Sequence, residues 1–93
     1  MIGQESAEAM ALQALEWLAG QDELFPQFLG ATGANIADLP LAATRPEFLA
    51  AVVDFLLMDD AMVIGFCDAV GMRYEMPMQM RALLPGGPGP HWT

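Results

Sequence analysis

The segment PEFLAAVVDFLLMDD, residues 46–60, is the most informative part of this sequence. Successive residues of a helix lie about 100° apart, so the apolar side chains of this segment cover well over half of the circumference. The remaining positions share one narrow strip: Glu47, Ala51, Asp54 and Met58. We therefore expect residues 46–58 to form a central hydrophobic helix that other helices surround.

Both ends of this central helix are marked by residue type. Thr44 and Glu47 have the spacing of a capping box, and Pro46 suits a first helical turn. At the other end, Asp59 and Asp60 break the apolar run, and carboxylates at such a point stabilise a new helix N-terminus. The sequence therefore predicts a tight corner followed by a second helix.

This second helix is expected over about residues 60–70, with Gly71 ending it. Its broad apolar face comprises Met62, Val63, Phe66, Cys67 and Val70. Small residues recur beside that face at four-residue steps: Ala61, Gly65 and Ala69. A glycine inside a helix costs about 1 kcal/mol relative to alanine, so Gly65 favours close packing of another helix against this stripe. An exposed glycine without a packing role is the alternative.

The rest of the chain also shows helical spacing. Near the N-terminus, a helix is expected to begin at Ser6, whose hydroxyl can cap backbone N–H groups, and to stop at Gly20. Its inner face comprises Met10, Ala14, Trp17 and Leu18. The remaining capping and helix-breaking residues predict three shorter segments. One helix begins at about residue 22 and is ended by Gly30 and Gly33, and another runs from Pro77 to Leu84. Between them, one or two kinked helical turns are capped by Asn35 and interrupted by Pro40.

These segments predict an all-α fold, a compact orthogonal bundle of five to six short helices. A chain of 93 residues has room for one core, and 55% hydrophobic residues are too many for a solvated, disordered chain. We expect one domain over residues 1–84, followed by a tail rich in proline and glycine over residues 85–93.

The net charge of −9 excludes several classes of partner. Three arginines and no lysine cannot form the basic groove that neutralises nucleic-acid phosphates, and an anionic membrane surface is disfavoured for the same reason. The longest apolar region is interrupted by aspartates and does not predict a membrane span. Without a secretory signal pattern, and with Cys67 as the single cysteine, the chain is expected in the cytoplasm.

The residue types that are missing also restrict catalysis. Without lysine, the chain has neither a Schiff-base nucleophile nor a phosphate-loop lysine, and no glycine-rich nucleotide motif follows a strand. The single histidine, His91, lies in the tail, so one chain cannot build a multi-histidine metal site. We expect no cofactor and no enzymatic activity.

Four aspartates carry the main alternative, a small enzyme or a metal-binding protein. Asp54, Asp59, Asp60 and Asp68 fall within fifteen residues, and clustered carboxylates bind hard cations or act as acid–base pairs. Arg73 and Tyr74 from the next loop would complete such a site. The simpler interpretation is that these aspartates cap helices or lie on a solvated strip, and we favour it.

Sulfur-containing residues form a second group, since Met72, Met76, Met78 and Met80 follow closely after Cys67. Such ligands suit Cu(I), but only Met76 and Met80 share a helical face, which favours apolar packing or a partner groove. Cys67 lies on an apolar face, where a thiol is usually inert. In the tail, Trp92 either folds back on the helices or binds a partner. The candidate partner-binding residues are therefore Met76, Met80 and Trp92.

Several segments together suggest a family: PEFLAAVVDFLLMDD (46–60), FCDAVG (66–71), FLGATG (28–33) and the terminal LLPGG and HWT. On these segments the chain resembles a family of short, single-domain alphaproteobacterial proteins classed as a domain of unknown function. The resemblance extends over nearly the whole chain. It implies a small cytoplasmic helical protein and brings no activity, substrate or binding residue with it.

The functional prediction is therefore a small acidic module for protein–protein interaction, which binds an unidentified protein partner or a second copy of itself. Over half of the residues are apolar, and a domain of this size leaves part of its apolar surface exposed. The alternative remains an enzyme or metal site at the aspartates or in the segment from Met72 to Met80.

Overall fold

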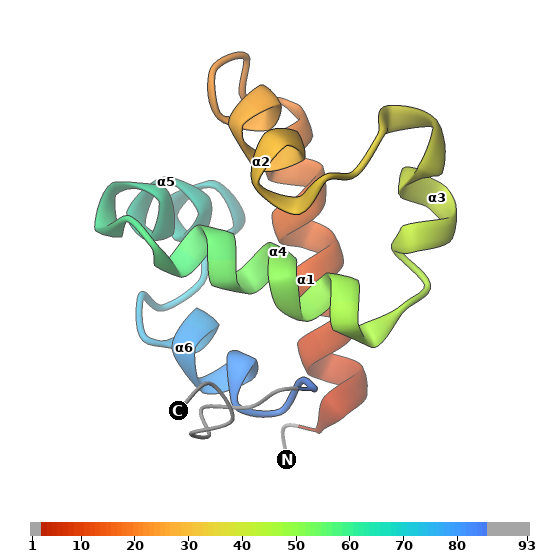
Figure 1. Cartoon of the computed structure of the whole chain (residues 1–93). Helices are drawn as coiled ribbons and strands as arrows, with labels where there is room; N and C mark the ends of the chain where they lie inside the picture. The colour runs from red at the N-terminus through yellow and green to blue at the C-terminus, as the bar shows by residue number, and fades with distance from the viewer. Residues whose placement is uncertain (1–2, 86–93) are drawn as a thin grey trace, which may run out of the picture.

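The computed structural model describes residues 3–85, and their regular structure is entirely helical. The elements are α1 (Gln4–Ala19), α2 (Leu24–Thr32), a short 3₁₀ helix η1 (Ile36–Asp38), α3 (Leu39–Ala42), α4 (Pro46–Leu57), α5 (Asp60–Val70) and α6 (Met76–Arg81). Figure 1 shows α4 lying across α1, with α2, α5 and α6 around this pair. The predicted all-α bundle is confirmed. Within residues 3–85, no helix combines the length and apolar character needed to cross a bilayer.

Helix α4 is the central helix, as predicted, because it packs against α1, α2, α5 and α6. Its buried residues are Leu49, Ala50, Val52, Val53, Phe55 and Leu56. The predicted outer strip is also found, since Glu47, Asp54 and Met58 are exposed and Ala51 is half-buried. The wide apolar face of this one helix thus provides contacts for most of the bundle.

The capping box predicted for α4 is wrong. The residue at the N-cap is Arg45, and its side chain makes no capping hydrogen bond. Thr44 lies one position too early, and its hydroxyl donates to the carbonyl oxygen of Leu41 at 2.6 Å. The threonine therefore closes the end of α3, while Pro46 begins α4 as expected.

Helix α5 begins at the predicted corner after α4 and ends at the predicted glycine. The backbone N–H of Ala61 donates to Asp59 Oδ1 at 2.9 Å, so this aspartate is the N-cap. Gly71 ends α5 in the left-handed conformation, with φ 72°. The apolar face is buried except at Val70, which is exposed and corrects the prediction there.

Three other helix boundaries differ from the prediction by about one turn. Helix α1 begins at Gln4, because the N–H of Ala7 already bonds to the carbonyl of Gly3, and Ser6 lies inside the first turn. Gly30 lies within α2, and Gly33 alone ends it. Helix α6 stops at Arg81, after which Leu83 and Leu84 make three-residue turns. The segment around Pro40 forms one 3₁₀ turn and one α-helical turn, as expected.

Arg81 joins α6 to the central helix. Its Nε donates to Asp54 Oδ1 at 2.6 Å and its Nη2 to Oδ2 at 3.2 Å. Its Nη1 also donates to the carbonyl oxygens of Leu84 and Pro85, at 3.4 and 3.0 Å. One guanidinium therefore links the outer strip of α4 to the end of the described chain.

The small residues of α5 do not form a surface for another helix. At Gly65, an added Cβ would lie 3.0 Å from Cζ2 of Trp17, so the close neighbour is an aromatic side chain of α1. Trp17 also packs edge-on against Phe66, with ring centroids 6.1 Å apart. Ala61 and Ala69 are exposed, which corrects the prediction of a continuous packing stripe. Only the middle position of the three needs to be small.

Candidate functional site

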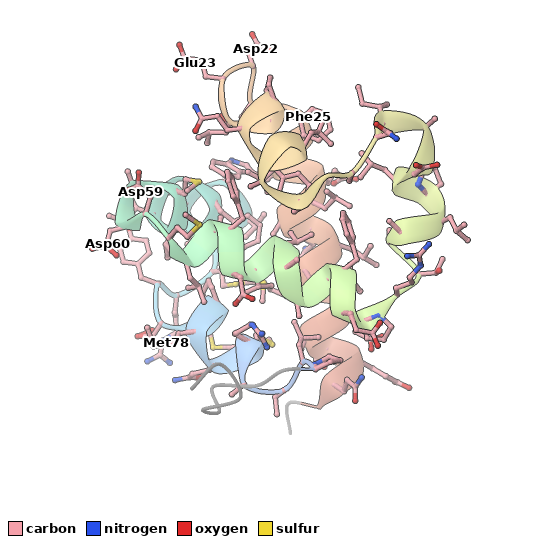
Figure 2. All side chains as sticks on the ribbon, viewed as in Figure 1. Asp22, Glu23, Phe25, Asp59, Asp60 and Met78 are labelled. Carbon is pink, nitrogen blue, oxygen red and sulfur yellow. The ribbon has the colours of Figure 1, made fainter. Side chains whose placement is uncertain are left out.

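The four aspartates of the predicted acidic site do not converge. Figure 2 shows Asp59 and Asp60 at the corner between α4 and α5, with both side chains at the surface. Asp54 pairs with Arg81, and Asp68 accepts a hydrogen bond from Tyr74. Across residues 3–85, no three His, Cys, Asp or Glu side chains are grouped so as to hold a metal ion.

The methionines of residues 72–80 are divided between core and surface. Met80 is buried and Met76 packs against the core, because α6 turns this face toward α1 and α4. Much of their apolar surface is therefore used inside the bundle, and their assignment as partner-binding residues stays a prediction. Met78 is 69% exposed and points away from the bundle (Figure 2). The third predicted partner-binding residue, Trp92, lies outside the described residues.

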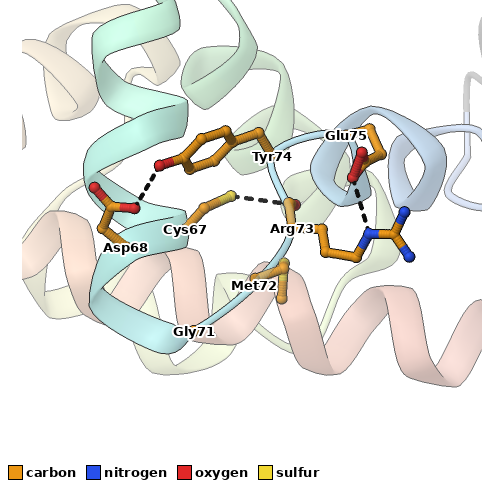
Figure 3. Close-up of a pocket in the computed structure, with 7 residues that line it drawn as sticks. All are labelled: Cys67, Asp68, Gly71, Met72, Arg73, Tyr74 and Glu75. Carbon is orange, nitrogen blue, oxygen red and sulfur yellow. Dashed lines mark hydrogen bonds and ion pairs between the residues drawn. The ribbon is translucent and has the colours of Figure 1, made fainter.

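A shallow pocket of about 400 Å³ opens between α5 and the loop that leads to α6. We call it the α5–α6 pocket; its lining residues are Cys67, Asp68, Gly71, Met72, Arg73, Tyr74 and Glu75 (Figure 3). Gly71 reverses the chain, and the N–H of Met72 then donates to the carbonyl of Cys67 at 2.9 Å. The loop consequently runs back beside the helix that it has just left.

Cys67 and Met72 give the pocket an apolar side. Cys67 is buried, and its Sγ lies 3.6 Å from the carbonyl oxygen of Arg73, to which the thiol donates. Burial raises the pKa of the Cys67 thiol, and the negative charges of Asp68 and Glu75 raise it further. The thiol therefore stays protonated at neutral pH, and the prediction that Cys67 is a packing residue is confirmed.

Tyr74 and Asp68 form the polar side of the pocket. The Tyr74 hydroxyl donates to Asp68 Oδ1 at 2.7 Å, as the dashed line in Figure 3 shows. This hydrogen bond, together with the carboxylate charge, raises the pKa of Tyr74, because ionisation of the phenol would remove the donor. The phenol is thus a neutral group that orients the carboxylate.

The charges that line the pocket leave one negative charge without a counter-charge. Arg73 Nε lies 3.2 Å from Glu75 Oε1, so these two residues neutralise each other. Within residues 3–85, no cationic nitrogen lies within salt-bridge distance of Asp68. The arrangement offers a carboxylate, a phenol and an apolar wall, which suits binding of a ligand that carries one positive charge.

Sequence reasoning identified several of these residues without bringing them together. Asp68, Cys67, Arg73 and Tyr74 were each candidates, but the expected site lay at the corner between α4 and α5. The pocket lies at the opposite end of α5. The available signal was Gly71, because a left-handed glycine after a helix reverses the chain and returns the next residues toward the helix.

The comparisons with known proteins give a family and no activity. Neither a search of curated proteins nor a search of solved structures finds a match. The family model described as "Protein of unknown function (DUF3572)" matches residues 4–87, a range that includes every described helix. The expected resemblance to a family of unknown function is thereby confirmed. The chain belongs to the DUF3572 family.

Proposed function

We propose that this protein is a small non-enzymatic module that binds a partner protein through a surface segment rich in arginine or lysine. One observation carries the proposal. All twelve carboxylates and all three arginines lie in the described part of the chain, yet only Glu75 and Asp54 form ion pairs with arginine there. The other ten carboxylates are available to a cationic partner.

Exposed apolar side chains accompany these charges. The large exposed ones are Leu12, Ile36, Leu41, Met58, Ile64, Val70, Tyr74, Met78 and Leu83. Met58, at 76% exposure, directly precedes Asp59, and Ile64 lies one turn from Asp68 on α5. Apolar contacts supply affinity and carboxylates select a cationic partner, so this mixture supports protein recognition.

The charge favours a different protein over a second copy. Two chains that each carry −9 repel each other, whereas a basic partner is attracted. Light scattering on the purified full-length chain should therefore give a monomer at low salt. A stable dimer at low salt would contradict this choice of partner.

The state of Cys67 supports binding in preference to covalent catalysis. A nucleophilic cysteine reacts as its thiolate and usually lies in an electropositive, partly exposed environment. Cys67 is buried, and the charged side chains that shift its pKa are two carboxylates. Slow reaction of this thiol with iodoacetamide at neutral pH is the expected outcome.

The proposal is tested by calorimetric titration of the full chain with a short amidated amphipathic peptide that carries several lysines and one central arginine. We expect binding that weakens as salt is raised, because added ions screen the carboxylates. The control peptide has the same apolar residues with every basic residue replaced by glutamate. Absence of binding to the basic peptide, or equal binding of both peptides, would overturn the proposal.

A further inference from the structure

We infer that the α5–α6 pocket binds one arginine side chain of the cationic partner, with its guanidinium held by the carboxylate of Asp68. This inference rests on the proposed function and names the position at which recognition is specific. It follows from the charge, the acceptors and the shape of the pocket.

The charge of the pocket matches a single cation. Arg73 and Glu75 neutralise each other at 3.2 Å, which leaves Asp68 as the one unbalanced charge among the lining residues. A carboxylate accepts about four hydrogen bonds, and Asp68 receives one, from the Tyr74 hydroxyl. It therefore keeps acceptor positions for the two parallel N–H donors of a guanidinium.

The apolar side of the pocket suits the stem of the same side chain. Arginine places its methylene groups on apolar surface while its charged end stays near water. Cys67 is buried and Met72 is half-buried, and both line the pocket. The volume of about 400 Å³ lies toward the lower end of ligand pockets, which span about 300–1,000 Å³, and has room for one long side chain.

Tyr74 favours arginine over lysine. The residue is 54% exposed, and its hydroxyl is held beside Asp68 by the 2.7 Å hydrogen bond (Figure 3). A planar guanidinium can stack on such a ring while it makes paired hydrogen bonds to a carboxylate, whereas an ammonium group cannot form the paired bonds. The two lining groups therefore act together only on arginine.

The test measures affinity for the lysine-rich peptide with its central arginine, and for versions with citrulline or lysine at that position. Asp68→Asn should weaken binding of the arginine peptide about tenfold, because it removes the charge of the acceptor. Asp60→Asn is the matched control, since it removes the same charge from an exposed position at the other end of α5. We expect less than about a threefold loss there.

Both variants should keep their fold, since the amide oxygen introduced by Asp68→Asn still accepts a hydrogen bond from the Tyr74 hydroxyl and Asp60 is exposed. A thermal melt of each variant checks this. Supporting results are a larger loss for Asp68→Asn than for Asp60→Asn, weaker binding of the citrulline and lysine peptides, and NMR shifts of the Met72 methyl and the Tyr74 ring on binding.

Two outcomes would overturn the inference in distinguishable ways. Equal losses for Asp68→Asn and Asp60→Asn would show that only the overall charge matters, so the pocket assignment would fail while the proposed function stands. Undetectable binding of any basic peptide to the unmodified chain would overturn the proposed function and the pocket assignment together.

Discussion

At the scale of single residues, Tyr74 and Asp68 show how one hydrogen bond sets the state of a site. The phenol donates to the carboxylate at 2.7 Å, which fixes the relative position of the two groups at the rim of the pocket. The bond exists only while the phenol is protonated. The geometry of this rim is therefore linked to pH in the alkaline range.

This linkage predicts the titration of Tyr74, which is the single tyrosine of the chain. Its pKa in the folded protein is raised by the hydrogen bond and charge of Asp68, above the ordinary value of about 10. Its stabilising contribution is complete below the unfolded pKa and disappears as pH rises through the folded pKa, because the unfolded state then loses its proton first. Tyrosinate absorbance during a pH titration measures the shift. Asp68→Ala removes both the hydrogen-bond acceptor and the charge, so it should bring the pKa back toward about 10, and an unchanged value would contradict the proposed cause.

Gly65 is the second residue whose role depends on one contact. A Cβ at this position would lie 3.0 Å from the Trp17 ring, so Gly65→Val should force the ring away from Phe66. We expect the free energy of unfolding to fall by about 1–3 kcal/mol, as in other overpacked sites, measured by urea denaturation with tryptophan fluorescence. Ala69→Val is the control, because Ala69 is exposed on the same helix. Equal losses of unfolding free energy in both variants would show that the low helix propensity of valine alone is responsible.

At the scale of elements, α4 and α5 were predictable because their signals are local. The breadth of the apolar face of α4 indicates a central helix without knowledge of its neighbours, and Asp59 caps α5 from two residues away. Other features depend on residues far apart in the sequence. The ion pair of Asp54 with Arg81 spans 27 positions, and no local pattern specifies it.

The α5–α6 pocket could not be predicted for a related reason. Its lining residues are close in sequence, but they come together only because Gly71 reverses the chain and the loop then lies beside α5. The start of α1 was missed because Gly3 and Ser6, one turn apart, can both precede a helix. The backbone bond from Ala7 to Gly3 extends the helix by that turn.

The central position of α4 predicts a large effect of Leu56→Ala. Leu56 is fully buried, and its truncation should leave a cavity and lower the free energy of unfolding by about 2–5 kcal/mol. Met58→Ala is the control, since this side chain is 76% exposed, and it should change the free energy by less than about 0.5 kcal/mol. Thermal and urea unfolding measure both. Similar stabilities of the two variants would contradict the assignment of α4 as the centre of the core.

At the scale of the whole molecule, the excess of carboxylates over arginines limits the stability of the fold and makes its surface acidic. Ten carboxylates without a cationic partner in residues 3–85 repel one another across a bundle with extents of 32 × 28 × 25 Å. Two of them, Asp22 and Glu23, are adjacent at the turn before α2 (Figure 2). Salt should reduce this repulsion, since the screening length is about 8 Å at physiological ionic strength.

We therefore expect added sodium chloride to raise the free energy of unfolding by roughly 1 kcal/mol, the size of a typical surface charge interaction. The double variant Asp22→Asn with Glu23→Gln removes two neighbouring negative charges, so its free energy of unfolding should depend less on salt. Urea denaturation at several salt concentrations measures both proteins. A stability that falls as salt is added would show that the two ion pairs outweigh the repulsion.

The guanidinium of Arg81 has a mechanical consequence. It holds two carbonyl oxygens at the end of the described chain, those of Leu84 and Pro85, while its other nitrogens bind Asp54 on the central helix. A pulling force applied to the chain at Pro85, for example through a fused protein, is thus transmitted to α4 as well as to α6. The hydrogen bonds of Arg81 must break before α6 separates from the bundle. These hydrogen bonds therefore make Pro85 a mechanically resistant site at which to attach another protein.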